Sequence, residues 1–215
     1  AERMAKNGWR VRVAVRRPNE ALLARQYGAV GQAEPVLCNI RDDASVLAAA
    51  AGADAVVNCV GILSEVGKNK FQDVQALGSA RVARVSSEQG VMNFVQISAI
   101  GANEDSSSNY ARTKALGEAS ILKYFPEATI LRPSIIFGAE DQFFNRFAQM
   151  ATLSPFLPLV GANTKFQPIY VGDVAAAVEK ALLDSSVSGV YELGGPNVET
   201  FSELMKRMLG VIQRR

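Results

Sequence analysis

The stretch Tyr110-Ala-Arg-Thr-Lys114 opens a helical pattern and follows an apolar run that ends at Ser98. Side chains four positions apart lie on one face of a helix, so the phenol of Tyr110 and the ammonium of Lys114 can meet at one bound group. A nearby ammonium favours the phenolate and lowers the pKa of a phenol that ordinarily titrates near ~10. A serine hydroxyl close by can bind the same substrate oxygen. The spacing predicts an acid–base pair, and the alternative is a packed tyrosine beside a solvated lysine.

Around this stretch, short β-branched runs alternate with longer helical patterns, which is typical of a parallel sheet covered on both faces. Strands are predicted at residues 10–16, 35–40, 55–60, 93–98, 129–131 and 190–193. Helices are predicted at residues 19–27, 44–51, 71–89, 110–124, 142–152, 174–183 and 201–212. We therefore predict an α/β fold with a doubly wound parallel sheet.

The composition limits the classes of function. The 215 residues are 48% hydrophobic and carry a formal net charge of +2, with the basic residues scattered, so the sequence predicts a sizeable core and no nucleic-acid partner. No apolar stretch approaches the ~20 residues of a bilayer-spanning helix. Histidine is absent, which excludes imidazole-based triads. Cys38 and Cys59 lack metal-ligand spacing, so we predict buried, reduced thiols and no metal site.

The beginning of the sequence has the pattern of a helix end. Residues 1–8 resemble the last turns of a helix with its C-terminal glycine, and a predicted strand follows at once. A doubly wound sheet places its first strand at the centre, and the turn after that strand carries a glycine-rich pyrophosphate loop. No G-x-G-x-x-G occurs in the sequence. We expect the first strand and this loop to be missing from a chain that is part of a longer polypeptide.

An ordered set of motifs runs through nearly the whole chain: Arg16-Arg17-Pro18, residues 38–42, residues 58–61, Ser98, Tyr110 with Lys114, residues 131–134, Phe137-Gly138 and residues 168–174. Together they resemble the short-chain dehydrogenase/reductase superfamily, in its extended and atypical branch. Residues 106–118 and 125–141 are similar to the nucleotide-binding accessory subunits of respiratory complex I and their bacterial relatives. The resemblance implies a Rossmann-type NAD(P)-binding domain over residues 1–138 and a small, incomplete C-terminal lobe over residues 139–215, with elements that return to the sheet.

Arg16 and Arg17 stand at the end of the first predicted strand. Nucleotide-binding folds of this kind place there either a carboxylate for the ribose hydroxyls of NAD or an arginine for the 2′-phosphate of NADP. A guanidinium suits a phosphate, and no acid accompanies the pair, so NADPH is favoured over NADH. The alternative is a pair of solvated arginines.

The resemblance assigns further residues to the dinucleotide. It implies that Asn39 and Ile40 lie beside the adenine and that Asn58 and Gly61 lie near the cofactor, where a glycine lets the backbone approach closely. It also implies that Pro133 and Ser134 meet the nicotinamide. For Gly61 and Pro133, a strand-to-loop glycine and a proline-marked strand exit remain the alternatives.

In a catalytic site, the resemblance makes Tyr110 the proton donor or acceptor to a carbonyl or alcohol. Lys114 would hold the nicotinamide ribose and lower the pKa of that phenol, and Ser98 would bind the reacting oxygen. In a structural site, the same residues would only grip the ribose. Gln75 stands where many extended members carry the asparagine of the proton relay.

The resemblance implies an NADPH-binding accessory or assembly subunit of respiratory complex I, with a structural cofactor and with complex I subunits as partners. It implies a peripheral location, on the cytoplasmic face of a bacterial inner membrane or the matrix side of the mitochondrial one. The alternative is a free NADPH-dependent reductase, dehydrogenase or epimerase that uses Ser98, Tyr110 and Lys114 on a small carbonyl or nucleotide-sugar substrate. A redox-sensing regulator that binds NADPH without chemistry is a third possibility.

Overall fold

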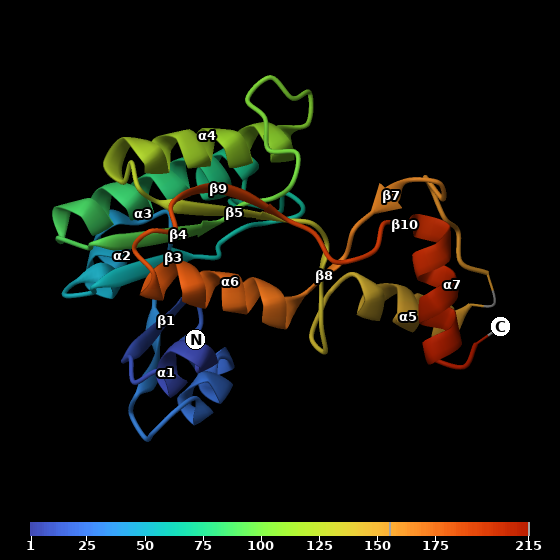
Figure 1. Cartoon of the computed structure of the whole chain (residues 1–215), viewed down its shortest axis with the longest axis horizontal. Helices are drawn as coiled ribbons and strands as arrows, with labels where there is room; N and C mark the ends of the chain where they lie inside the picture. The colour runs from blue at the N-terminus through green and yellow to red at the C-terminus, as the bar shows by residue number, and fades with distance from the viewer. Residues whose placement is uncertain (155, 215) are drawn as a thin grey trace. The chain divides into compact units, whose positions relative to one another are not determined.

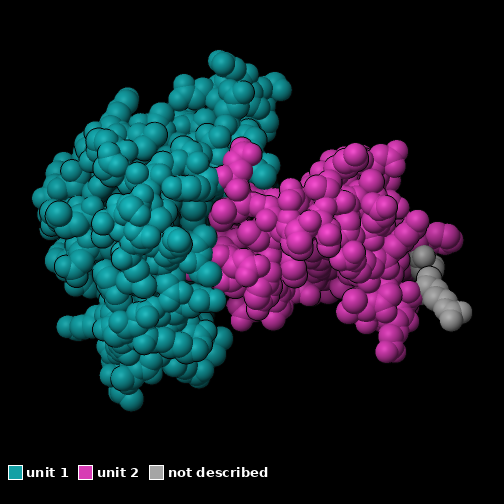
Figure 2. Space-filling model, in the orientation of Figure 1, with its two compact units in different colours: residues 1–132, 176–191 teal, residues 133–175, 192–215 magenta. Residues whose placement is uncertain are grey.

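A computed structural model describes residues 1–154 and 156–214 of the chain (Figure 1). The chain divides into two compact units, drawn in different colours in Figure 2. Unit 1 contains residues 1–132 and 176–191, and unit 2 contains residues 133–175 and 192–215. The boundary therefore follows residue 132, whereas the sequence places it at residue 138, and a later segment of the chain returns to unit 1.

Unit 1 contains parallel strands in two sheets. One sheet pairs β1 (Val11–Val15) with β2 (Ala33–Leu37). The other has the strand order β3 (Ala55–Asn58), β4 (Asn93–Ile97), β5 (Thr129–Pro133) and β9 (Gly189–Leu193). The parallel pairs β3–β4 and β4–β5, with helices between the strands, confirm the predicted α/β class with parallel strands. The two sheets are separate, because within residues 1–154 and 156–214 no strand pairs with both β1 and β3.

Helix α3 (Leu77–Glu88) packs between α2 (Asp43–Ala50) and α4 (Asn109–Tyr124), and it contacts β3 of the four-stranded sheet, whereas α2 contacts β2. Figure 1 shows α3 and α4 on one face of the sheet. The short α1 (Glu2–Lys6) confirms the helix end predicted before the first strand. Buried apolar side chains join α3, α4 and β4 into a core cluster: Ala83, Val91, Phe94, Ile121, Phe125 and Ala128. Burial of this apolar surface is the main force that holds α4 in place.

Two predicted helices differ from the structure. The segment predicted as a helix at residues 19–27 forms two 3₁₀ turns, η1 (Pro18–Glu20) and η2 (Leu22–Gln26). Proline removes one backbone donor, and Gly28 ends the segment at a φ of 75°. The helix predicted at residues 71–89 begins with a π-helical turn, η3 (Gln72–Ala76), before α3. The predicted burial of both thiols is also wrong: Cys38 is half-buried and Cys59 is exposed.

Unit 2 contains α5 (Phe144–Leu153) and α7 (Phe201–Val211), which pack against each other. Its short strands pair β6 (Ile136–Phe137) with β8 (Ile169–Tyr170) and β7 (Lys165–Phe166) with β10 (Glu199–Thr200). Helix α6 (Val171–Leu183) begins in unit 2 and continues in unit 1. An aromatic cluster forms the core of unit 2: Phe143, Phe144, Phe147, Phe166 and Phe201.

Among the described residues, no helix is both long and apolar enough to traverse a bilayer.

Candidate functional site

Helix α4 positions the two residues of the opening motif. It begins after Ser108, whose hydroxyl accepts a hydrogen bond from the Ala111 N–H at 3.5 Å, and it ends before Pro126. A Cβ added at Gly117 would lie 2.5 Å from the carbonyl oxygen of Gln75, so only glycine allows α4 to approach η3 this closely. The close contact fixes the face of α4 that carries Tyr110 and Lys114.

Lys114 is buried, with 7% of the residue exposed, and its Nζ donates to the carbonyl oxygen of Ile97 at 3.2 Å. Burial lowers the pKa of Lys114, and the nearby charge of Glu118 opposes that shift. A Cβ added at Gly61 would lie 3.2 Å from the same Nζ. The ammonium thus lies between the end of β4 and the turn after β3, and Gly61 leaves room beside it.

Tyr110 is half-buried, and its ring meets that of Phe71 edge to face, with the centroids 5.9 Å apart. Burial raises the pKa of the Tyr110 phenol above its ordinary value. The expectation that Lys114 lowers this pKa is therefore wrong for the protein as described. Burial thus favours the protonated phenol over the phenolate.

Ser98 lies at the end of β4, where its N–H donates to the Leu131 carbonyl oxygen at 2.7 Å. Its hydroxyl donates to the carboxylate of Glu118, and both residues are buried. The guanidinium of Arg132, on β5, donates to the same carboxylate, with Nη2 2.6 Å from Oε2 and Nε 3.1 Å from Oε1. The single proton of Ser98 is thus directed to a protein carboxylate. Sequence reasoning gave Glu118 and Arg132 no role.

Asn58 ends β3 as a buried residue whose side chain is engaged within the fold. Its amide donates to Ser79 Oγ at 3.2 Å and to Gln96 Oε1 at 2.9 Å, and its oxygen accepts from the Val60 N–H. The amide therefore ties β3 to α3 and β4. These contacts favour a structural role over direct cofactor contact.

Gln75 is also fully buried. Its amide nitrogen donates to the carbonyl oxygen of Ile62 at 2.8 Å, and its oxygen accepts from the hydroxyl of Thr113 at 3.2 Å. These bonds join the π-helical turn to α4 and to the segment after β3. Gln75, which stands at the position of the relay asparagine, therefore connects the segments that surround the site.

Arg16 and Arg17 follow β1 and are both exposed. Arg17 pairs with Glu20 at 2.9 Å, whereas no ion pair of Arg16 is found within residues 1–154 and 156–214. Because β1 and β2 are parallel, with Val15 opposite Leu37, the arginines and Asn39 lie at the same edge of their sheet. The structure thus places Arg16, Arg17 and Asn39 at one edge of this sheet.

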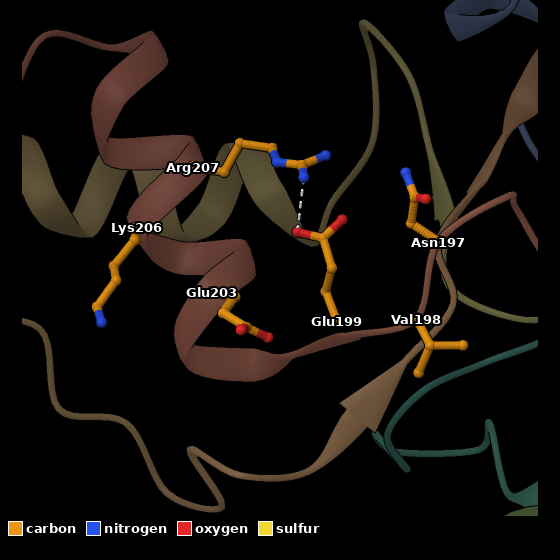
Figure 3. Close-up of a pocket in the computed structure, with 6 residues that line it drawn as sticks. All are labelled: Asn197, Val198, Glu199, Glu203, Lys206 and Arg207. Atoms are coloured by element: carbon orange, nitrogen blue, oxygen red, sulfur yellow. Dashed lines mark ion pairs between the residues drawn. The ribbon is translucent and has the colours of Figure 1, made fainter.

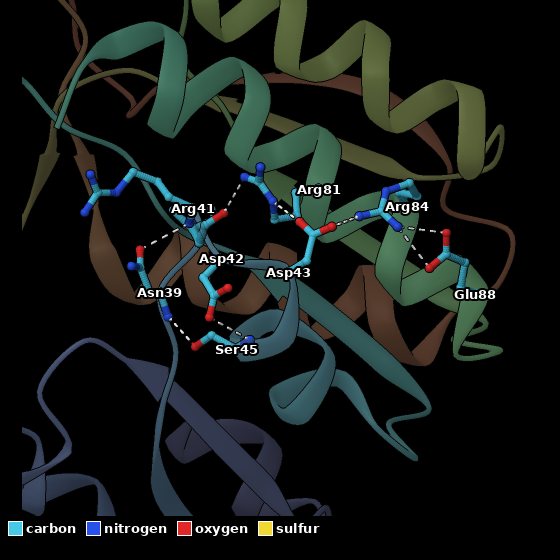
Figure 4. A network of polar contacts seen from close by, with 9 residues as sticks. Asn39, Arg41, Asp42, Asp43, Ser45, Arg81, Arg84 and Glu88 are labelled. Carbon is cyan, nitrogen blue, oxygen red and sulfur yellow. Dashed lines mark hydrogen bonds and ion pairs between the residues drawn. The ribbon is translucent and has the colours of Figure 1, made fainter. Parts of the chain in front are cut away.

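Asn39 shapes the turn after β2 (Figure 4). Its backbone N–H donates to Ser45 Oγ at 2.8 Å, and its side-chain oxygen accepts from the Arg41 N–H at 3.2 Å. Ile40 is buried against α3, where a Cβ added at Gly78 would lie 3.1 Å from its Cγ1. The side chain of Ile40 therefore packs under α3.

A polar network extends from this turn along α3, as Figure 4 shows. Arg81 donates to the carbonyl oxygen of Ile40 at 3.0 Å and to Asp43. Arg84 pairs with Asp43 at 2.6 Å and with Glu88 at 2.9 Å. The network anchors the turn after β2 to α3.

Pro133 and Ser134 belong to unit 2, whereas the other predicted site residues belong to unit 1. Pro133 ends β5 as a buried residue, and the N–H of Ser134 donates to the carbonyl oxygen of Leu193 at 2.8 Å.

Unit 2 also contains two pockets that the sequence did not predict. A shallow pocket next to α7 is lined by Asn197, Val198, Glu199, Glu203, Lys206 and Arg207 (Figure 3). Arg207 pairs with Glu199 across it at 2.9 Å. A neighbouring cavity of about 490 Å³ has an apolar wall that includes Phe137, Phe144, Leu204 and Met208. Neither pocket is lined by a predicted site residue.

The sequence matches the model of the NAD dependent epimerase/dehydratase family over residues 1–194. It is 38% identical to NADH dehydrogenase [ubiquinone] 1 alpha subcomplex subunit 9, mitochondrial, of Arabidopsis thaliana, over 99% of this chain and 54% of that protein. It is 29% identical to a ceramide reductase of Caulobacter vibrioides, over 94% of this chain and 63% of that protein. The chain thus spans about half of the length of the first of these relatives.

Among solved structures, the chain is similar to dTDP-glucose 4,6-dehydratase (DesIV) from Streptomyces venezuelae, determined with NAD and TYD bound. The TM-score is 0.80 and the identity 20%, over 95% of this chain and 72% of that one. This likeness shows a shared fold, and it agrees with the parallel strands and covering helices of unit 1.

Proposed function

The chain belongs to the NAD dependent epimerase/dehydratase family, and from that premise we propose that it is an NADPH-binding accessory or assembly subunit of respiratory complex I with a structural cofactor. The observation that carries the proposal is the similarity, over nearly the whole chain, to relatives named as subunits of that complex. On this proposal, the partners are other complex I subunits. The location is the cytoplasmic face of a bacterial inner membrane or the matrix side of the mitochondrial one.

The donors at the carboxyl ends of the strands suit a dinucleotide. Lys114 and Tyr110 offer an ammonium and a phenol to ribose hydroxyls, and Gly61 leaves space next to the ammonium. Arg16, exposed after β1, offers a guanidinium to a 2′-phosphate, which favours NADPH over NADH. A bound nicotinamide would supply hydride chemistry, and these residues would hold and orient it.

A protonated Tyr110, favoured because burial raises its pKa, suits the proton donor of a carbonyl reduction. One contact nevertheless supports a structural cofactor over that reaction. The Ser98 hydroxyl donates to Glu118, so its proton is not free to polarise a carbonyl oxygen. A ligand that binds only the native state adds stability by mass action, which is the role proposed for NADPH.

The test is native purification of the full-length protein from its source, with its co-migrating proteins and its released nucleotide identified in one preparation. We expect stoichiometric NADPH together with complex I subunits. A free protein that never fractionates with respiratory membranes would contradict the proposal.

The second candidate function is a free NADPH-dependent reductase, dehydrogenase or epimerase acting on a small carbonyl or nucleotide-sugar compound. It is favoured by the presence of Ser98, Tyr110 and Lys114 and by the relative named ceramide reductase. It predicts NADPH oxidation with some member of a carbonyl panel, and the loss of that oxidation in Tyr110→Phe. A panel without any Tyr110-dependent turnover would remove this candidate.

A further inference from the structure

A buried ammonium needs a compensating negative charge, because desolvation strongly disfavours an isolated ion. Lys114 is such a group, and the hydrogen bond described for its Nζ goes to the neutral carbonyl oxygen of Ile97. Four residues further along α4, Glu118 is buried with it, and residues at this spacing lie on one face of a helix. Glu118 is therefore the acidic group placed to compensate Lys114.

We propose that Glu118 is a positioning residue of the dinucleotide site: its carboxylate, fixed by Ser98 and Arg132, supplies the negative charge that lets Lys114 present a buried ammonium to the ribose. This inference rests on the proposed binding of NADPH. Glu118 itself contacts protein groups and acts on the ligand through the lysine.

Two partners fix the carboxylate from different strands. Ser98, at the end of β4, donates its hydroxyl, and Arg132, on β5, donates through two nitrogens. Charge-assisted, bidentate contacts of this kind are strong and define the orientation of a carboxylate. The guanidinium is 23% exposed and the carboxylate 6%, so solvent screens the positive charge of Arg132 more than the negative charge of Glu118.

The groups that face Lys114 come from several elements. Cys59 follows β3, Glu118 lies on α4, and Arg132 reaches the Glu118 carboxylate from β5. Burial lowers the pKa of Lys114, and the charges of Glu118 and Cys59 raise it. Removal of the Glu118 charge therefore lowers the pKa of Lys114 further, and the ammonium is lost at a lower pH.

The experiment measures the NADPH affinity of the full-length protein against pH, by nicotinamide fluorescence, for the wild type and Glu118→Gln. We expect similar affinities near pH ~6.5 and about tenfold weaker binding by the variant near pH ~9, which corresponds to loss of one charge-assisted hydrogen bond. Glu88→Gln is the matched control, because it removes an exposed carboxylate that also pairs with an arginine. The NADPH affinity of the E88Q variant should depend on pH in the same way as that of the wild type.

Further variants separate this role from a general structural one. An arginine stays charged over this pH range, so a K114R/E118Q double variant should show the same pH dependence as K114R alone. Glu118→Asp keeps the charge and should keep the pH dependence of the wild type. Coincident or parallel curves for wild type and E118Q would overturn the inference.

Arg132→Gln provides a separate test, which does not depend on whether the E118Q variant folds. It removes the guanidinium but keeps the carboxylate, so NADPH affinity should persist to a higher pH than in the wild type. If the R132Q variant lost NADPH affinity at the same pH as the wild type or at a lower pH, the inference would be overturned. Failure of the proposed function is distinguishable, because the wild type would then not bind NADPH at any pH.

Discussion

The hydroxyl of Ser98 donates to the carboxylate of Glu118, and the two side chains are buried together between β4 and α4. An ionised carboxylate has no proton to give back, so the serine can offer only its lone pairs to any other group. This arrangement differs from the role expected for Ser98 in a reductase, in which the hydroxyl donates to the reacting oxygen.

Ser98→Ala should therefore reduce stability more than ligand binding. Loss of a buried hydrogen bond to a charged group costs about 1.5–3 kcal/mol, and NADPH affinity should stay within about threefold of the wild type. Urea unfolding and fluorescence titration measure the two effects, with the exposed Ser87→Ala as the control. A large loss of affinity at unchanged stability would show instead that Ser98 touches the ligand.

Lys114→Met should weaken NADPH binding by at least about tenfold, because the donor to the ribose is lost. Stability should be maintained or lowered, because the buried Glu118 loses one compensating charge and keeps its ion pair with Arg132. Isothermal titration and thermal unfolding check both effects. Lys123→Met, on the exposed face of the last turn of α4, is the control and should change neither.

Arg16→Ala should lower the affinity for NADPH by about 10- to 100-fold and leave NADH binding nearly unchanged. The lost contact is a charge-assisted hydrogen bond to the 2′-phosphate, which NADH lacks. Parallel titrations with the two nucleotides measure the preference. The control is Arg10→Ala, an exposed arginine that precedes β1, and equal losses for NADPH and NADH in R16A would contradict the assignment.

Gly117→Ala should destabilise the protein by about 1–3 kcal/mol, because the added methyl would lie 2.5 Å from the carbonyl oxygen of Gln75 and would force α4 away from η3. Denaturant unfolding measures the cost. Gly210→Ala is the control, since a Cβ there meets nothing within 4 Å and alanine favours a helix. An unchanged stability in G117A would show that the two helices separate at little cost.

Thr200→Ala should cost about 1 kcal/mol, because Thr200 and Glu203 form a reciprocal capping box at the start of α7. Hydrogen bonds from Thr200 lower the pKa of Glu203 below its ordinary value of 4.5. A carboxyl with a lowered pKa stabilises the fold above its unfolded pKa, and this contribution disappears as the pH falls through the folded pKa. The cost of T200A in unfolding experiments should therefore shrink below about pH 4.5. If the stability cost of T200A did not change with pH, this result would argue against the capping box.

The local sequence pattern was sufficient to predict the strand and the helix that carry the site residues. The strand predicted at residues 93–98 corresponds to β4 (Asn93–Ile97), and the helix predicted at residues 110–124 corresponds to α4 (Asn109–Tyr124). Helical spacing puts Tyr110 and Lys114 on one face without reference to the rest of the chain. The short strands β6, β7, β8 and β10 were missed, because two-residue strands leave no periodic pattern.

By itself, the sequence determined the α/β class, the order of its main elements and the position of Tyr110 and Lys114 four residues apart on one helix, because these depend on spacings within one segment. Only the tertiary structure decided the partner of Ser98, which lies 20 residues away on α4, and the contact of Glu118 with Arg132 on β5. It also decided that β1 and β3 belong to separate sheets. Such contacts arise when distant segments bury their surfaces together, and desolvation then selects which polar groups must pair.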